Sequence, residues 1–283
     1  MDKTLKQIFK TKKPIIGMIH FPPLVGYPEF PGIDYITKKA IREVKILSKE
    51  KVDAIMVENN YDTPHKEFVA PEITAMIAYL TNKVCQNTNL PVGISTLWND
   101  YKTSLGVCAT TRASFIRIPA FIDTVDTSYG LMKKRSKEAT ALRKKLNLNH
   151  VAILADVQVK HSEMINRNKS LSQSIKEAIR DQADAIIITG RWTGDSPKLD
   201  DLEIARESAG NKFPILIGSG ATKDNVKQLL KYANGIIVGT AIKKGKNQSK
   251  KQETNLKPFQ YTISPVRARQ FTNACKQHEP RKN

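Results

Sequence analysis

Short apolar runs rich in β-branched residues alternate with longer amphipathic segments along almost the whole chain. This alternation is typical of parallel strands joined by helices that cover the sheet. Eight such units can be recognised, and no Gly/Ser-rich linker separates them into two groups. The predicted strands span residues 14–20, 53–58, 91–96, 114–119, 151–156, 183–189, 214–218 and 235–240.

Segments with apolar residues every three to four positions follow most of these strands, as expected for helices with one buried face. They predict helices over 33–49, 71–86, 129–146, 171–181, 200–209 and 223–232. A final helix is expected over 264–276, with Ser264 as its N-cap and Pro265 as its first residue. The segment before it, residues 243–260, is polar and basic, which is typical of a flexible loop.

The eight units fit either a closed barrel or an open, doubly wound sheet. An open sheet usually carries G-x-G-x-x-G after its first strand to bind a dinucleotide. Here the first strand ends at His20-Phe21-Pro22-Pro23, and two prolines cannot offer the N–H groups that cradle a pyrophosphate. The 283 residues are also close to the ~250 of one α/β barrel. We therefore predict an α/β protein with the (β/α)₈ TIM barrel fold, as a single domain over residues 1–283.

The chain carries a formal net charge of +19, and residues 243–283 contribute +9 of it, with eleven Lys and Arg against two Glu. Such an excess suits a phosphorylated metabolite, an anionic membrane surface or nucleic acid. Nucleic acid is disfavoured, because no predicted helix combines clustered basic residues with interleaved aromatics. Cys85, Cys108 and Cys275 are too widely spaced for a disulfide framework or a zinc site, which favours the cytoplasm. No stretch reaches the ~20 apolar residues of a membrane span, so any membrane contact is expected to be peripheral.

The strongest indication of function lies at the ends of the last two predicted strands. Strand seven runs into Gly218-Ser219-Gly220, and strand eight runs into Gly239-Thr240. Glycines let the main chain approach a ligand closely, and exposed N–H groups stabilise a phosphate dianion. Because barrels often bind phosphate with the loops after strands seven and eight, we predict a phosphate site formed by these residues. The same glycines could instead serve only tight turns.

Polar side chains at the other strand ends face the same mouth of such a barrel, where active sites lie. Asp156 and Glu58 are candidates for proton transfer, because crowded carboxylates take different pKa values. Lys160 and His20 complete the candidate catalytic set, with Lys160 as a tuned amine or a partner for an anion. The candidate substrate-binding residues are Asn59, Asn99, Arg117, Thr189, Gly190 and Trp192.

Several of these residues have a plainer alternative role. Asp156 could cap the following loop, Lys160 could lie in solvent, and Trp192 could cover the barrel rim. A divalent metal ion could be held by His20, Glu58, Asp156 and His161, although no tight ligand spacing indicates a metal site. The cofactor is therefore left open.

Five short motifs, in this order along the chain, resemble the BtpA/SgcQ family. They are GMIHFPPL at 17–24, VEN at 57–59, ADVQVKH at 155–161, TG at 189–190 and 193–194, and GSG at 218–220. The resemblance extends over about residues 14–276. It implies a barrel related to phosphate-binding barrels such as the isomerases and synthases of tryptophan biosynthesis. It also implies a link to a factor needed for photosystem I biogenesis in thylakoids, and it brings no established reaction.

Two functional classes follow. We expect first an isomerase, lyase or hydrolase that acts on a small phosphorylated metabolite, a sugar or nucleotide derivative, at the C-terminal face of the barrel. The alternative is a non-catalytic assembly or stability factor for a membrane protein complex, with the basic C-terminal segment against an anionic surface. Either protein could form a homo-oligomer.

Overall fold

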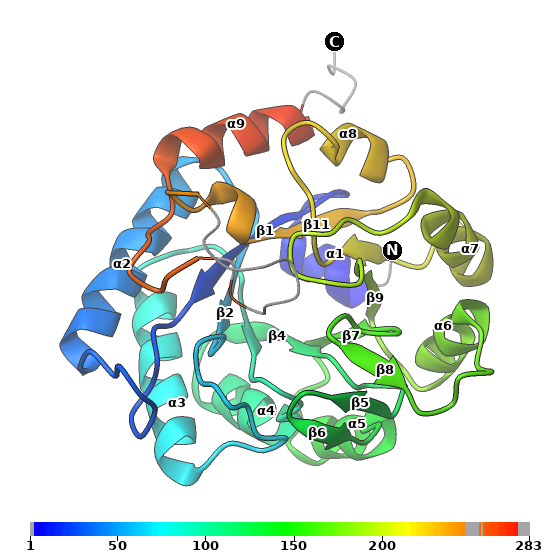
Figure 1. Cartoon of the computed structure of the whole chain (residues 1–283), viewed down its shortest axis with the longest axis horizontal. Helices are drawn as coiled ribbons and strands as arrows, with labels where there is room; N and C mark the ends of the chain where they lie inside the picture. Colours follow the sequence, from blue (N-terminus) through cyan, green and yellow to red (C-terminus); the bar gives the residue numbers. More distant parts are fainter. Residues whose placement is uncertain (1–2, 247–254, 256, 277–283) are drawn as a thin grey trace.

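A closed ring of parallel strands forms the centre of the molecule, and helices surround it (Figure 1). The computed structural model describes residues 3–246, 255 and 257–276. The barrel strands are β1 (Ile15–His20), β2 (Ala54–Glu58), β3 (Val92–Ser95), β4 (Ala113–Ile118), β7 (Ala152–Asp156), β9 (Ala185–Ile188), β10 (Ile215–Ile217) and β11 (Gly235–Val238). They pair in chain order, and β1 closes the ring by pairing with β11. The predicted (β/α)₈ fold is therefore confirmed.

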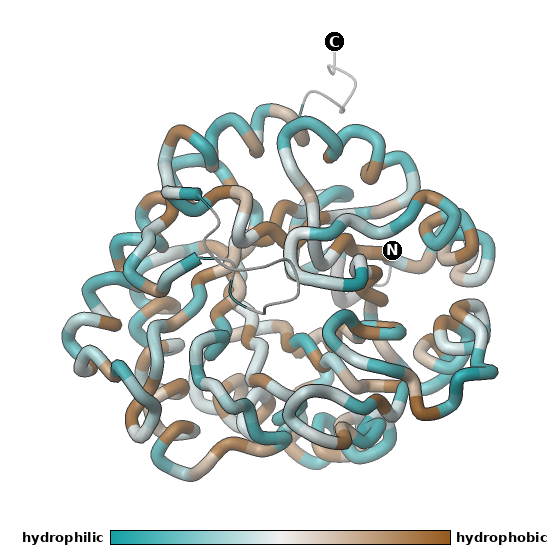
Figure 2. Tube along the Cα trace, in the orientation of Figure 1, coloured by the Kyte–Doolittle hydropathy of each residue, from teal (hydrophilic) through white to brown (hydrophobic). Residues whose placement is uncertain are grey.

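The outer ring of helices explains the amphipathic segments of the sequence. On α2, Ile36, Ala40 and Val44 recur every four residues and are buried, whereas the chain between them is largely polar. Figure 2 shows the same division, because apolar residues gather around the central strands and the outer turns are mostly hydrophilic. The helices are α1 (Lys3–Phe9), α2 (Ile33–Lys49), α3 (Pro71–Gln86), α4 (Tyr101–Thr110), α5 (Ser136–Lys145), α6 (Leu171–Arg180), α7 (Leu199–Ala209), α8 (Val226–Leu229) and α9 (Pro265–Lys276), with a 3₁₀ turn, η1 (Thr240–Ile242).

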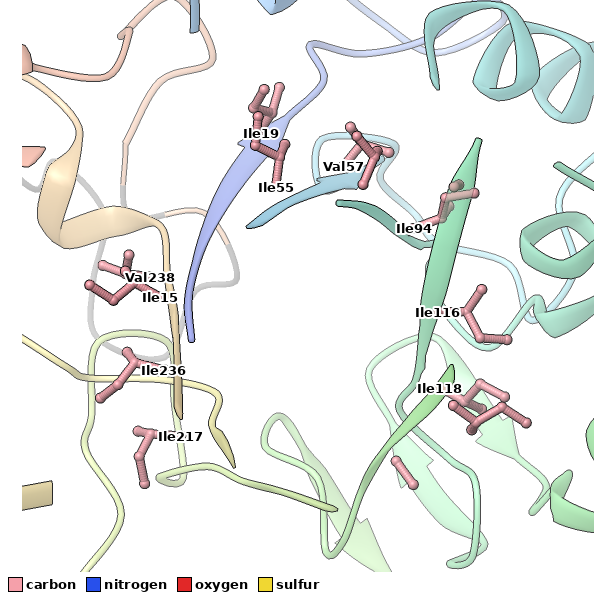
Figure 3. Packing of buried hydrophobic residues seen from close by; sticks show 14 of the residues in the cluster. Ile15, Ile19, Ile55, Val57, Ile94, Ile116, Ile118, Ile217, Ile236 and Val238 are labelled. Carbon is pink, nitrogen blue, oxygen red and sulfur yellow. The ribbon is translucent and has the colours of Figure 1, made fainter. Parts of the chain in front are cut away.

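The barrel strands are buried on both faces, which is why they read as continuous apolar runs. Side chains such as Ile19, Val57 and Ile116 point outward against the helices, as Figure 3 shows. The alternate positions point into the barrel and form a second cluster. Phe9 of α1 belongs to this inner cluster, and its ring meets the Phe115 ring edge-on, with centroids 5.2 Å apart. The helix α1, which the sequence did not predict, therefore covers the inside of the barrel.

Three further helices differ from the prediction. The helix expected over 129–146 begins only at Ser136, because the chain before it forms an antiparallel hairpin of β5 (Val125–Thr127) and β6 (Gly130–Met132), joined by β8 (Ser162–Met164). The helix expected over 223–232 is reduced to α8. Helix α4 was not predicted, and Asp100 caps it by accepting the Thr103 N–H.

The basic segment 243–260 also differs at the positions that can be compared. Residues 247–254 and 256 lie outside the described residues. At the described ends, Lys243 and Lys257 are only 2% and 6% exposed. These two lysines are therefore not part of a solvated surface loop. After them α9 begins at Pro265, and Ser264 accepts the Arg267 N–H as expected of an N-cap.

Candidate functional site

The carboxyl ends of the strands surround a cavity of about 450 Å³. Its wall combines residues that are far apart in the sequence but adjacent in the barrel, from His20 after β1 to Lys243 after β11. Among the described lining residues, Glu58 is the one carboxylate, and six are Lys or Arg. The cationic lining residues are Arg117, Lys160, Lys243, Lys246, Lys257 and Arg267. The cavity is therefore suited to an anionic ligand.

The two glycine segments, residues 218–220 and 239–240, lie side by side and line this cavity together. They follow neighbouring strands, because β10 pairs with β11 through Leu216–Gly235 and Ile217–Ile236. Within the described part of the chain, the N–H groups of residues 219–220 and 239–240 donate to no protein acceptor. Such unpaired N–H groups at a cavity wall are available to an oxyanion.

Two close approaches explain the glycines. Gly220 has φ +66°, and a Cβ there would lie 2.0 Å from the Ser196 nitrogen. At Gly239, a Cβ would come within 3.0 Å of the His20 ring. The absence of side chains at these positions keeps the main chain at the cavity surface.

The Ser219 hydroxyl is already used inside the protein. It accepts the Gly190 N–H at 2.8 Å and donates to the Asp195 carbonyl at 2.8 Å. It therefore ties the loop after β9 to the end of β10. A phosphate beside residues 218–220 would therefore contact the main chain of Ser219 and not its hydroxyl. Gly190 was predicted to bind substrate, but its N–H donates to the Ser219 hydroxyl.

A charged cluster lies at the same mouth of the barrel, and its His20 ring lies beside Gly239. The Arg117 Nε and Nη2 donate to the two oxygens of Asp156, both at 2.8 Å. Glu58 lies on the other side, 3.7 Å from the Arg117 guanidinium and 3.6 Å from the His20 Nε2. Asp156 is 1% exposed and orients Arg117, while Arg117, Glu58 and His20 line the cavity.

Burial and the surrounding cations change the protonation of His20 and Lys160. Burial, followed by Lys243 and three other cations, holds the pKa of His20 well below 6.5, so this ring is neutral at neutral pH. Burial, followed by Arg117, lowers the pKa of Lys160 to about 8, although Glu58 and Asp156 oppose the shift. Lys160 is half-buried and lines the cavity, which differs from the solvent-exposed alternative.

The loop after β9 reaches the cavity through Thr193 and Gly194. The Thr193 hydroxyl is 2.8 Å from the His161 Nε2 and 3.4 Å from the Lys160 Nζ. Thr189 accepts the Lys160 N–H at 3.2 Å. Trp192 packs beside the His161 ring, with centroids 5.3 Å apart. Thr189 and Trp192 thus support this loop and the lysine that it contacts.

Asn59 and Asn99 are buried, and their amides hold loop backbone in place. Asn59 accepts the Leu97 N–H at 2.7 Å and donates to Asp62 at 3.1 Å. Asn99 accepts the Ala120 N–H at 2.9 Å. These amides therefore shape the loops that border the site.

Sequence reasoning missed Lys243, Tyr61 and Lys257, which also line the cavity. The Lys243 Nζ donates to the Tyr61 hydroxyl at 3.3 Å and lies over its ring. The Lys257 Nζ donates to three carbonyls, those of residues 243, 244 and 245, at 3.0–3.1 Å. Lys243 could have been identified as a site residue by its position, three residues after Thr240. The many lysines around it made it look like part of a basic surface loop instead.

The proposed metal ligands do not fit a metal site. In the described part of the chain, no group of three or more His, Cys, Asp or Glu is arranged to hold an ion. Asp156 has both oxygens occupied by Arg117, and the His161 Nε2 faces Thr193. No described helix is long and apolar enough to cross a membrane.

The closed parallel barrel and the cavity at its carboxyl ends define a (β/α)₈ barrel protein. Solved structures agree: N-(5′-phosphoribosyl)anthranilate isomerase from Pyrococcus furiosus aligns with a TM-score of 0.55 at 14% identity, covering 93% of this chain and 99% of that one. Thiamine phosphate pyrophosphorylase from the same organism aligns with a TM-score of 0.56 at 14% identity, covering 95% and 98%. These likenesses show the fold.

The sequence comparisons show the family. The model of the BtpA family matches residues 11–260, and the chain belongs to this family. It is 34% identical to the photosystem I biogenesis protein BtpA of Synechocystis sp., over 95% of this chain and 90% of the relative. It is also 34% identical to an uncharacterized protein of Methanocaldococcus jannaschii, over 82% of this chain and 88% of that relative.

Proposed function

We propose that this protein is an enzyme that acts on a small phosphorylated metabolite, a sugar or nucleotide derivative. The observation that carries the proposal is the pair of glycine segments, whose unpaired N–H groups border a cavity rich in cations. Main-chain N–H groups and nearby cations together stabilise a phosphate dianion. The phosphate would rest against residues 218–220 and 239–240, and the rest of the metabolite would extend toward Arg117 and Glu58.

The charged cluster at the barrel mouth suits a reaction that moves a proton while negative charge develops on oxygen. Arg117 is fixed by Asp156 and can stabilise an enolate or alkoxide without reorganisation. Glu58 can take a proton as a carboxylate, and neutral His20 beside it can accept or relay one. An isomerisation or an aldol-type cleavage next to a carbonyl fits these groups best, with hydrolysis as the alternative.

The comparisons support the same proposal. Both solved relatives named above have a phosphorylated compound in their names, and they share the barrel. At 14% identity these structures show a shared fold and not a shared substrate, so the substrate of this chain has to be found experimentally.

Ligand-dependent thermal unfolding tests the phosphate site. Inorganic phosphate, ribose 5-phosphate and a panel of other phosphosugars should raise Tm, since a ligand at 100 times its Kd adds about 2.7 kcal/mol to stability. Ser219→Glu places a carboxylate beside the glycine segments and should abolish this shift. Gln228→Glu adds the same charge on the exposed side of α8 and should preserve it. Equal stabilisation of Ser219→Glu and the unchanged protein would reject the phosphate site.

A second candidate function is that of an assembly factor for a membrane protein complex, which the name of the Synechocystis relative favours. Residues 243–283 carry much of the positive charge, so their deletion would be the obvious test of membrane binding. It is unsuitable, because it would also remove the buried Lys243 and α9 from the fold. Sedimentation of the whole chain with vesicles of anionic or neutral lipid is the better measurement. Binding to anionic vesicles that phosphosugars leave unchanged would support this role.

A further inference from the structure

Lys243 is a buried lysine that lines the cavity directly after the second glycine segment. It follows η1, three residues beyond Thr240, and its side chain is almost fully enclosed. The Nζ atom lies 5.2 Å from the centre of the Tyr61 ring and donates to the Tyr61 hydroxyl at 3.3 Å. The amine is therefore held in place beside the proposed phosphate position.

This amine has no carboxylate partner to neutralise it. In the described part of the chain, no Asp or Glu oxygen forms an ion pair with Lys243. The carboxylate of Glu43, which is close enough to affect it, is bound by Lys39 at 2.6 Å. Burial, together with the cations Lys39 and Lys257, lowers the pKa of Lys243 to about 7, against the opposing effect of Glu43 and Glu58. A large fraction of this amine is therefore neutral at neutral pH, and a neutral amine is a nucleophile.

A second buried lysine in the same cavity shows what a structural role looks like. A lysine ammonium has three N–H donors. Lys257 uses them on three carbonyl oxygens at 3.0–3.1 Å. Within the described part of the chain, the Lys243 Nζ makes one hydrogen bond, and it is a long one at 3.3 Å. Because burying a poorly hydrogen-bonded amine is unfavourable, a role in ligand chemistry accounts for Lys243 better than a role in folding.

We propose that Lys243 forms an imine with a carbonyl carbon of the phosphorylated substrate, an inference that rests on the proposed function. The neutral Nζ attacks the carbonyl carbon, a C–N bond forms, and the oxygen takes a proton from a cation that lines the cavity, such as Lys160. The carbinolamine nitrogen then gives one proton to the hydroxyl, the C–O bond breaks, the oxygen leaves as water, and a protonated imine remains. The step consumes one proton, releases one water and involves no oxidant or reductant. The substrate class is therefore a phosphorylated aldehyde or ketone.

Trapping with pyridoxal 5′-phosphate and sodium borohydride tests this proposal, because the probe carries both an aldehyde and a phosphate. Borohydride reduces an imine to a stable secondary amine, and peptide mapping by mass spectrometry locates it. In the unchanged protein Lys243 should be the dominant labelled residue, with labelling that increases as the pH rises through about 7. Pyridoxal, which lacks the phosphate, should label it about tenfold less, and inorganic phosphate should protect it.

Three variants sharpen the test. Lys243→Arg and Lys243→Met should lose this label, whereas Lys244→Arg, at the exposed neighbouring position, should retain it. Dominant labelling of Lys160 or of surface lysines in the unchanged protein would overturn the proposal, and this result does not depend on how the variants fold. If phosphate binds but Lys243 stays unlabelled, the imine is wrong and the phosphate site stands. If pyridoxal and pyridoxal 5′-phosphate label Lys243 equally, Lys243 is a reactive amine but the proposed phosphate site is wrong.

Discussion

Arg117 of β4 and Asp156 of β7 meet in a two-point ion pair, with the Nε and Nη2 atoms each 2.8 Å from a different carboxylate oxygen. The two side chains come from adjacent barrel strands and are 7% and 1% exposed. A pair buried in this way fixes the plane of the guanidinium at the cavity wall. Asp156, the sequence's first candidate for proton transfer, is thereby a positioning residue for Arg117.

Breaking this pair should be strongly destabilising. We expect Asp156→Asn to lower the free energy of unfolding by about 3 kcal/mol, because the buried guanidinium loses its two-point carboxylate partner and keeps only the more distant Glu58, at 3.7 Å, as a counter-charge. Arg117→Gln combined with Asp156→Asn should cost less than the sum of the single changes. Urea denaturation measures these values. In the exposed pair Arg167–Glu163, Glu163→Gln should change stability by at most about 0.5 kcal/mol.

The close approach at Gly220 gives a second prediction. Gly220→Ala should destabilise the protein and abolish phosphate-dependent stabilisation, because the new Cβ would lie 2.0 Å from the Ser196 nitrogen. Gly210→Ala is the matched control, since Gly210 has φ +69° and open space around it. It should cost about 1–3 kcal/mol, because φ +69° with ψ 168° is a conformation essentially restricted to glycine, and it should leave phosphate binding intact. Similar phosphate responses in the two variants would contradict the role of Gly220.

The cover on the barrel interior gives a third prediction. Phe9→Ala should lower the free energy of unfolding by about 3–5 kcal/mol, because it removes a buried ring from its contact with Phe115. Tyr35→Ala, at a position that is 41% exposed, should have a much smaller effect. Thermal and urea unfolding of both variants provide the comparison. A small effect of Phe9→Ala would show that α1 contributes little to the barrel.

A buried histidine gives a prediction for acid pH. Within the described part of the chain both ring nitrogens of His65 lack a hydrogen-bond partner, and burial lowers its pKa to about 4. The unfolded chain protonates this group near pH 6.5, so between about pH 6.5 and 4 the unfolded state binds more protons than the folded state. Its contribution therefore lowers the free energy of unfolding as the pH falls, by up to about 3 kcal/mol.

The variant His65→Phe isolates this contribution. Its loss of stability between pH 6.5 and 4 should be smaller than that of the unchanged protein by about this amount. His150→Phe, at an exposed position, should retain the original pH dependence. Parallel pH profiles for His65→Phe and the unchanged protein would refute the assignment.

The barrel could be predicted because its strands are buried on both faces, so each leaves an apolar run, as at Ile15–His20 and Ala185–Ile188. The two glycine segments could be predicted because chain order in a barrel is also spatial order. Helix α4 could not, because it is short and has little contrast between its faces. The hairpin of β5 and β6 was also missed, since its strands are only three residues long and the third strand of its sheet, β8, lies more than thirty residues later.

The location of the candidate site could be predicted better than the role of each residue in it. Glu58, Arg117 and Asp156 could be found from their positions at the ends of predicted strands. The sequence could not show which of the two carboxylates would pair with Arg117, since that depends on which strands are neighbours and on the directions of the side chains. Lys243 could not be separated from the lysines that follow it, because composition does not report burial.

The three carbonyl oxygens that converge on the Lys257 Nζ resemble the coordination shell of a bound cation. Here the cation is covalently attached to the chain, so its occupancy is set by folding and not by the ionic composition of the medium. The rim formed by residues 243–245 should accordingly keep its shape in a chelating buffer as well as in one rich in divalent ions.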